Sequence, residues 1–174
     1  MKKSVLKVQM FGTYSIEYEG NPVSFERNTT TKTNQLMQIL LQAGEKGVTR
    51  AKLLSDLFGD EEMSNPANSL RATVFRLRRL LAAAGLPEDE YVTIKGGSYY
   101  WTSGIPYELD AHQFEELLKK AEKENDPEKK KSYIEEACEL YRGEFLPQLG
   151  AEGWAVVLNA VSYTHLRAHE TLSD

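Results

Sequence analysis

The sequence predicts an α+β domain followed by an all-α helical hairpin. Within residues 1–104, short runs of alternating apolar residues stand at both ends, and three amphipathic helical segments lie between them. From residue 105 onward, apolar positions recur only at helical spacing. A chain of 174 residues that is 41% hydrophobic can bury one core of ordinary size and a second, smaller one.

The first strands are predicted at the N-terminus. Residues 7–11 and 14–18 alternate apolar and polar side chains and are rich in β-forming residues, with Gly12 between them. A turn at residues 19–22 leads to a third short strand at 23–25. Together these segments predict a small antiparallel sheet.

Three helices are predicted after the sheet. The first ends at Gly44, the second begins at Thr49 as its N-cap, and the third spans residues 66–84. Asn65 caps the third helix, and Pro66 occupies its first turn. Each helix has one apolar stripe, so each needs neighbours to cover that face. The stripes are Leu36, Ile39, Leu40 and Ala43, then Leu53, Leu54 and Leu57, then Leu70, Val74, Leu77 and Leu81.

A hairpin with a glycine turn closes this part of the chain. Its strands, 92–95 and 99–101, flank Gly96, Gly97 and Ser98. A sheet, three helices and a hairpin, in this order, are typical of a winged helix-turn-helix, with residues 66–84 as recognition helix and 92–101 as wing. We therefore assign residues 1–104 to a winged-helix DNA-binding domain.

Two further helices are predicted in residues 105–160, after a change of composition at residues 103–106. Asp110 is expected to cap the first helix, with Gln113 in capping-box register, and Gly143 to end the second. One αα-hairpin cannot cover its own apolar face, so we expect a truncated, TPR-like helical hairpin. Its stripes are Phe114, Leu117, Leu118 and Ala121, then Tyr133, Ala137, Leu140 and Tyr141.

Residues 161–174 are predicted to be a non-native tail. Residues 161–171 read VSYTHLRAHET, and all eleven match one reading frame of a transposase-type sequencing adapter. We therefore expect the natural coding sequence to end near Ala160 and exclude the tail from the fold. His165 and His169 have a spacing found among metal ligands, but within such a tail they indicate no metal site.

Charge is distributed unevenly along the chain. The net charge is −5, but residues 1–104 hold 13 Lys and Arg against 11 Asp and Glu, whereas residues 105–174 hold 8 against 15. Residues 65–84 contain four arginines and no acidic residue. Because nucleic-acid binding depends on local charge, the first domain is the better candidate for it.

The face of the third helix opposite its leucine stripe predicts base contacts in the major groove. Asparagine can read adenine, arginine can read guanine, and phenylalanine or alanine can contact a thymine methyl. Flanking arginines, and a lysine beside the two glycines of the wing, are suited to phosphates and the minor groove. Arg50 and Lys32, at or near helix starts, are secondary phosphate candidates. The predicted DNA-binding set is Asn68, Ser69, Arg71, Ala72, Thr73, Phe75, Arg76, Arg78, Arg79, Lys95, Gly96 and Gly97.

Other function classes find less support in the sequence. It contains no P-loop, dinucleotide-binding or nucleophile-elbow motif, so we predict no catalytic residue, no cofactor and no metal. His112 is interpreted as a surface residue and Cys138 as a partly buried small residue. With no apolar run long enough to span a membrane and no signal-peptide pattern, we expect a cytoplasmic, nucleoid-associated protein.

One alternative stays open: a winged helix that serves as a protein–protein interaction module without binding DNA. Phe75, an apolar residue on the outer face of the third helix, is the feature that favours it. Salt dependence separates the two hypotheses, because binding to phosphates weakens steeply with salt and an apolar protein interface does not.

Two segments of the first domain resemble a known family. Residues 68–81, NSLRATVFRLRRLL, resemble the N-x-L-R-x-x-V-x-R-L-R-R-x-L recognition helix of SARP-like activators, which are relatives of OmpR-type winged helices. Residues 94–99, IKGGSY, are similar to the R-G-x-G-Y wing of that family, with Lys95 for the arginine and Ser98 for the second glycine. Residues 8–14, VQMFGTY, also resemble its first strand.

The second domain resembles the TPR-like bacterial transcriptional activator domain (BTAD) that follows the winged helix in that family. Residues 110–114, 137–147 and 152–154 carry this resemblance, which extends over nearly all of residues 4–160. The resemblance implies a transcription regulator, usually an activator, that binds double-stranded DNA at direct repeats. It also implies a second copy of the protein on repeated half-sites and contact with RNA polymerase.

Overall fold

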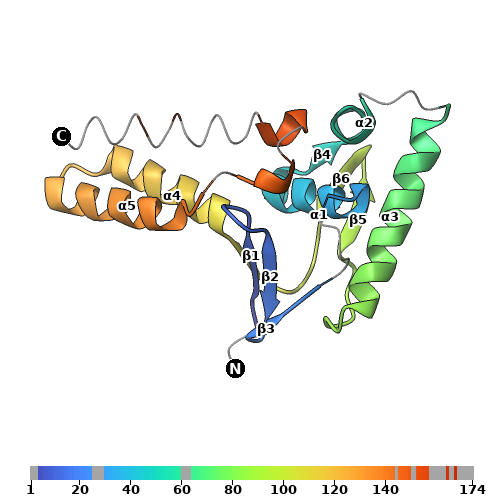
Figure 1. Cartoon of the computed structure of the whole chain (residues 1–174), viewed down its shortest axis with the longest axis horizontal. Helices are drawn as coiled ribbons and strands as arrows, with labels where there is room; N and C mark the ends of the chain where they lie inside the picture. The colour runs from blue at the N-terminus through green and yellow to red at the C-terminus, as the bar shows by residue number, and fades with distance from the viewer. Residues whose placement is uncertain are drawn as a thin grey trace. The chain divides into compact units, whose positions relative to one another are not determined.

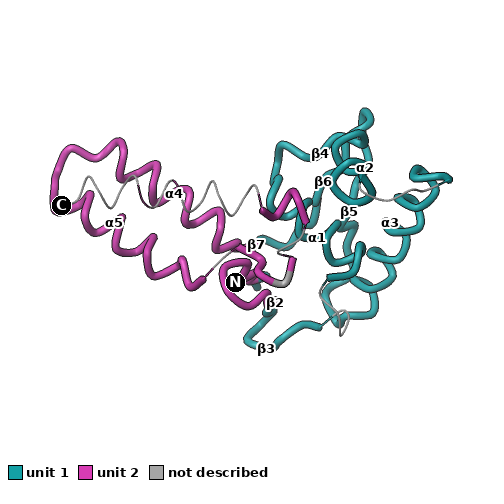
Figure 2. Tube along the Cα trace, turned by 45° about the horizontal axis from the view of Figure 1, so that its top comes forward, with its two compact units in different colours: residues 1–6, 16–106 teal, residues 7–15, 107–174 magenta. Residues whose placement is uncertain are grey.

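A computed structural model describes residues 4–24, 30–59, 64–143, 145–149 and 152–156, together with Thr164 and Arg167. The chain divides into two compact units (Figures 1 and 2). Unit 1 comprises Met1–Leu6 and Ile16–Pro106, and unit 2 comprises Lys7–Ser15 and Tyr107–Asp174. The segment Lys7–Ser15, which the sequence analysis places in the first domain, therefore groups with the later part of the chain.

The strands at the N-terminus form a four-stranded sheet with the order β3-β2-β1-β7. Its strands are β1 (Leu6–Gln9), β2 (Ser15–Tyr18), β3 (Asn21–Pro22) and β7 (Tyr107–Leu109). The third strand begins earlier than predicted, because Glu19 and Gly20 both have positive φ and form a two-residue hairpin turn. Antiparallel pairing therefore resumes at once, with Tyr18 opposite Asn21.

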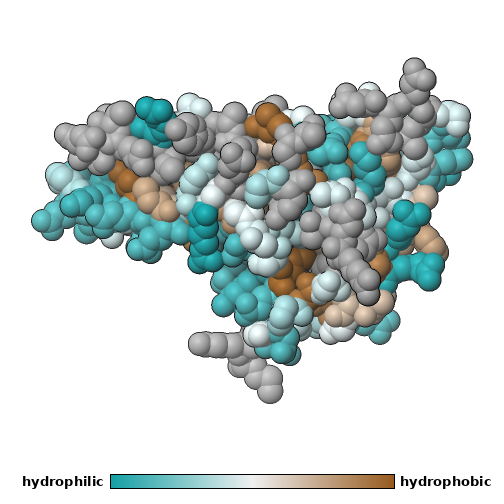
Figure 3. All heavy atoms as spheres, in the orientation of Figure 1, coloured by the Kyte–Doolittle hydropathy of each residue, from teal (hydrophilic) through white to brown (hydrophobic). Residues whose placement is uncertain are grey.

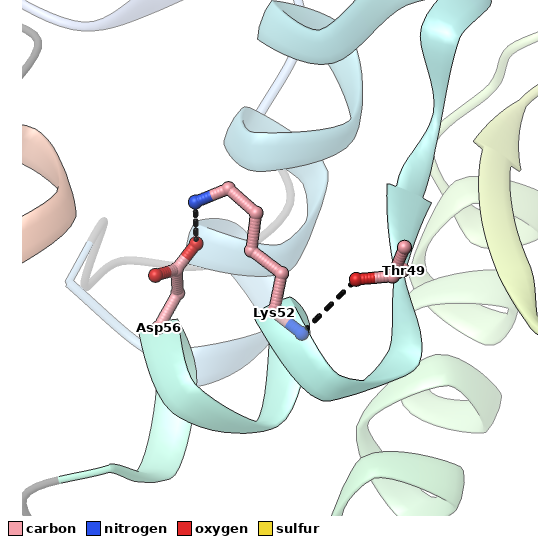
Figure 4. Close-up of polar contacts among 3 residues, drawn as sticks. All are labelled: Thr49, Lys52 and Asp56. Carbon is pink, nitrogen blue, oxygen red and sulfur yellow. Dashed lines mark hydrogen bonds and ion pairs between the residues drawn. The ribbon is translucent and has the colours of Figure 1, made fainter.

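The three predicted helices of unit 1 are confirmed as α1 (Lys32–Ala43), α2 (Arg50–Phe58) and α3 (Pro66–Ala83). Thr49 accepts a hydrogen bond from the backbone N–H of Lys52, as its predicted cap role requires, and Asn65 caps α3 in the same way. Figure 4 shows the cap of α2 beside the ion pair of Lys52 with Asp56, in which Nζ and Oδ2 are 2.9 Å apart.

The wing is a three-stranded sheet with the order β4-β6-β5, built from β4 (Val48–Thr49), β5 (Val92–Lys95) and β6 (Ser98–Trp101). Lys95 pairs with Ser98, so the turn consists of Gly96 and Gly97 alone, with φ of 59° and 77°. Ser98 thus begins a strand and needs no left-handed backbone. The two-residue strand β4 was not predicted, because so short a segment has no recognisable periodicity.

The core of unit 1 lies among the three helices and the wing sheet. Helix α1 packs against α3 and β6, and the leucine stripe of α3 is buried as predicted. This order of elements and this packing confirm the predicted winged-helix fold. The core side chains of these elements include Leu36, Leu40, Leu53, Leu57, Leu70, Val74, Leu77, Leu81, Val92, Tyr99 and Trp101.

Unit 2 is built on a helical hairpin of α4 (Asp110–Lys123) and α5 (Pro127–Leu140). The side chain of Asp126 caps α5, and the helix ends at Leu140, before the predicted stop at Gly143. Ile134 is buried where the predicted stripe placed Tyr133, which is only half-buried. The TPR-like character of this hairpin stays a prediction.

The predicted cap role of Asp110 is wrong. Leu109 is the N-cap of α4, and the Asp110 carboxylate instead accepts backbone hydrogen bonds from Met10 (2.8 Å), Phe11 (3.0 Å) and Ala111 (2.8 Å). Burial raises the pKa of the Asp110 carboxyl, and these three N–H donors and the charge of Arg142 oppose that rise. The Asp110 carboxylate therefore connects the start of α4 to the distant segment around Met10 instead of capping the helix.

An aromatic cluster fills the interior of unit 2 around Phe11. Its ring centroid lies 5.2 Å from that of Phe114, 5.0 Å from that of Tyr141 and 6.0 Å from that of Phe145. Segment 7–15 thus supplies a core residue to the helical hairpin, which explains its place in unit 2. Of the proposed tail, His165 and His169 lie outside the described residues, and its adapter origin stays a prediction.

Candidate nucleic-acid interface

Helix α3 is fixed in unit 1 by its buried stripe and by the cap at its start. Leu70, Val74, Leu77 and Leu81 are at most 4% exposed. The opposite face therefore points away from the core, because residues half a helical turn away lie on the other side. This face exposes Asn68, Ala72, Phe75, Arg76 and Arg79, as the sequence predicts.

The exposed face of α3 is positively charged. Arg71, Arg76, Arg78 and Arg79 are all exposed, and α3 has no acidic residue. Among the residues that the structure describes, no carboxylate forms an ion pair with any of the four. Figure 3 shows hydrophilic side chains along the outer edge of α3 with a small hydrophobic area among them. These guanidinium groups are available to an anionic partner.

Phe75 is the most exposed large apolar side chain in the described part of the chain, with 62% of its surface accessible. The guanidinium carbon of Arg79, one helical turn further on, lies 5.9 Å from the centroid of the Phe75 ring. At this distance the cation is attracted to the face of the ring. The two side chains therefore form a pair on the outer face.

Two members of the predicted set have intramolecular roles. Thr73 does not lie on the outer face, where the sequence analysis placed it. It is only 5% exposed, and its hydroxyl donates a hydrogen bond of 2.7 Å to the carbonyl of Ser69. Thr73 lies at the edge of the leucine stripe, where helical periodicity alone does not distinguish a buried position from an exposed one. Arg78 is exposed, yet its Nη2 donates to the carbonyl of Val92 at 2.9 Å and links α3 to the wing.

The wing tip is exposed and is tied to the start of α2. Lys95, Gly96 and Gly97 are exposed, and the Gly97 carbonyl accepts a hydrogen bond of 3.1 Å from the backbone N–H of Arg50. Arg50, also exposed, is therefore a neighbour of the wing tip, which sequence spacing could not reveal. Lys32, the other secondary candidate, instead places its ammonium group 5.8 Å from the centroid of the Phe58 ring.

The base of the wing is a packed structural element. Tyr91 and Trp101 have ring centroids 5.4 Å apart, and the Tyr91 hydroxyl donates to the carbonyl of Pro87. Burial, and then the nearby charge of Asp89, raise the pKa of Tyr91 to about 12, so its hydroxyl stays protonated as a donor. These aromatics close the core, and the cationic tip is left to face a partner.

Two other kinds of site are absent from the described ranges. Among those residues, no three His, Cys, Asp or Glu side chains gather as a metal site would require. Nor does any described helix have the length and apolar character to cross a membrane. The exposed cationic surface of α3 and the wing is thus the best-defined candidate site.

Comparison with known proteins indicates the kind of domain that carries this surface. Residues 26–101 match the family "Transcriptional regulatory protein, C terminal". A region of 123 residues, 66% of this chain, is 29% identical to protein RcaC of Microchaete diplosiphon, of which it covers 18%. The matched family comprises transcription regulators and is not an enzyme family.

A solved structure has a similar fold. Mycobacterium tuberculosis EmbR, in complex with a low-affinity phosphopeptide, superposes on 99% of this chain with a TM-score of 0.73 and 17% sequence identity. The chain covers 45% of EmbR. It therefore spans less than half the length of either of these proteins, and its likeness to EmbR concerns the fold alone.

Proposed function

We propose that this chain is a SARP-like regulator whose residues 26–101 form a winged helix of the OmpR/PhoB type, and that it binds double-stranded DNA sequence-specifically. Helix α3 enters the major groove, where Asn68, Arg76 and Arg79 face base edges. The wing tip lies on the adjacent backbone or in the minor groove, with Lys95 and Arg50 beside phosphates. Thr73 is not part of this interface.

One observation carries the proposal: α3 exposes four arginines, two on its outer face and two at its flanks, and contains no carboxylate. Four cations on one helix repel one another, an arrangement that an anionic partner relieves. A planar guanidinium also matches the two acceptors of guanine.

The same resemblance supports a proposal about the wider role. We propose that the protein acts as an activator, with a second copy on a repeated half-site and with RNA polymerase as a protein partner. A nucleoid-associated place in the cytoplasm is part of this proposal. The sequence-derived alternative, a protein-interaction module, is the outcome to be tested against it.

Binding of the full chain to random double-stranded DNA, measured at several salt concentrations, tests the proposal. Each phosphate contact should make the slope of log affinity against log salt more negative by about 0.9. Arg76→Ala and Arg79→Ala should weaken binding, whereas Lys119→Ala, an exposed lysine of α4, serves as the matched control. Absent or salt-insensitive binding by folded protein would contradict DNA binding and favour a protein partner.

A further inference from the structure

We propose that Phe75 and Arg79 form one reading unit that recognises a thymine and a guanine lying within two base pairs of each other. Phe75 contacts the thymine methyl, and Arg79 donates to the guanine. The inference rests on the proposed function and adds to it the base step that this part of α3 selects.

The contact between the two side chains is the first step. The Arg79 guanidinium lies over the Phe75 ring at 5.9 Å, and both side chains are exposed on the outer face of α3. An aromatic face restricts a guanidinium that would otherwise sample many rotamers. Arg79 is thus partly ordered before it meets a ligand, which favours a directional contact over a loose phosphate contact.

The chemistry of each side chain selects its base. Guanine presents two acceptors, O6 and N7, which a planar guanidinium can meet with two parallel N–H donors. Thymine is the base with a methyl group in the major groove, and that methyl is its apolar feature there. An exposed ring beside an ordered guanidinium is complementary to a thymine close to a guanine.

The spacing limits how far apart the two bases can be. Residues four positions apart are about 6 Å apart along a helix axis. Successive bases of one DNA strand are about 3.4 Å apart. The two side chains therefore span at most about two base steps, so the thymine and the guanine are neighbours or have one base pair between them.

The surroundings of Phe75 argue against a protein partner at this position. Its four nearest helical neighbours are Ala72 and three arginines, Arg71, Arg78 and Arg79. A protein-docking surface is expected to be a contiguous apolar patch, whereas this ring stands alone among cations. Its exposure is therefore better explained by a ligand that combines negative charge with small apolar groups, as thymine-containing DNA does.

The methyl contact can be tested with the full chain. An operator is selected from random duplexes with the wild-type protein, and each thymine is then replaced singly by uracil, which lacks the methyl. One replacement should weaken wild-type binding about fourfold, the effect of one buried carbon. Phe75→Ala should bind the intact operator about equally weakly and be insensitive to that replacement. Ile94→Ala, which truncates another exposed apolar side chain of unit 1, should keep wild-type sensitivity.

The arginine contact is tested by replacing single guanines near that thymine with 7-deazaguanine, which lacks N7. The wild type should lose affinity at one such guanine, and Arg79→Ala should not distinguish the two bases. Phe75→Leu should keep sensitivity to the methyl but discriminate less well at the guanine. A wild type that binds DNA but is unaffected by every uracil, or a Phe75→Ala protein as sensitive as the wild type, would overturn this inference alone. Absence of DNA binding would overturn the proposed function with it.

Discussion

Helices α1 and α3 show the same apolar periodicity in sequence, but their polar side chains end in opposite environments. In α1, Asn34 is 4% exposed and Gln35 and Gln38 are each 1% exposed. The Gln35 amide donates to the carbonyl of Thr30 at 2.9 Å. In α3, by contrast, the polar residues opposite the stripe, among them Arg76, are exposed.

The difference separates side chains that are packed inside the protein from side chains that folding leaves exposed. A buried polar group that loses its partner inside the molecule destabilises the fold by about 1–3 kcal/mol. An exposed arginine is hydrated and contributes little to stability. The α1 helix has neutral amides on its polar side and α3 has cations, and this choice of residues matches the two environments.

The largest effect is expected when the polar side of α1 is given a charge. Gln35→Glu removes the donor to Thr30 and buries a carboxylate, which should lower the free energy of unfolding by about 3–5 kcal/mol. Arg76→Glu, a charge change on the exposed side of α3, should alter stability by less than about 0.5 kcal/mol and abolish DNA binding. Urea unfolding measures the stability of both variants, and titration with DNA measures their binding. Equal losses of stability would contradict the proposed difference between the polar sides of α1 and α3.

Two glycines, Gly47 just before β4 and Gly96 at the wing tip, show the same contrast between a packed and an exposed site. Gly47 and Gly96 have φ of 68° and 59°, but a Cβ on Gly47 would overlap the Tyr100 ring, and one on Gly96 would meet nothing within 4 Å. Gly47→Ala should therefore lower the free energy of unfolding by about 3 kcal/mol, because backbone strain and overpacking act together. Gly96→Ala should cost about 1 kcal/mol, from strain alone. Thermal unfolding of the two variants measures the difference, and similar melting temperatures would contradict it.

Local signals in the sequence predicted the winged helix well. The caps at Thr49 and Asn65, the stripe of α3 and the Gly96–Gly97 turn all depend on residues close together in the chain, and the structure confirms them. The outer face of α3 followed from the same periodicity. Its role in DNA binding stays a prediction.

The elements that the sequence did not predict depend on contacts between distant residues. Asp110 satisfies the amides of Met10 and Phe11, a hundred residues earlier, although its position in the chain suggests a helix cap. Strands β4 and β7 are two and three residues long and exist through their partners in a sheet. The nearness of Arg50 to the wing tip also follows from folding alone.

Asp110 extends the comparison, because it is a buried charge that three backbone donors stabilise. Asp110→Asn replaces one acceptor oxygen with an NH2 group, which faces one of those N–H donors. The substitution should lower the free energy of unfolding by about 2 kcal/mol at pH 7. Since the folded-state pKa of Asp110 is raised, proton binding to its carboxyl stabilises the folded state; this contribution is fully present below the unfolded-state pKa and is lost as pH rises through the folded-state pKa. The difference in unfolding free energy between wild type and Asp110→Asn should therefore be larger at pH 4 than at pH 7. Urea titrations at both values test the sign, and a larger difference at pH 7 would reverse it.

Arg78 is exposed like the other arginines of α3 but also forms a hydrogen bond inside the protein, so a small loss of stability is expected when it is replaced. It donates this bond to the Val92 carbonyl of the wing. Arg78→Ala should lower stability by about 1 kcal/mol, the net value of one hydrogen bond, and also weaken DNA binding. Arg71→Ala, at the other flank of α3, should weaken DNA binding with no loss of stability. If both variants are as stable as the wild type, the link between α3 and the wing contributes nothing measurable, and Arg78 is a ligand-facing residue like its neighbours.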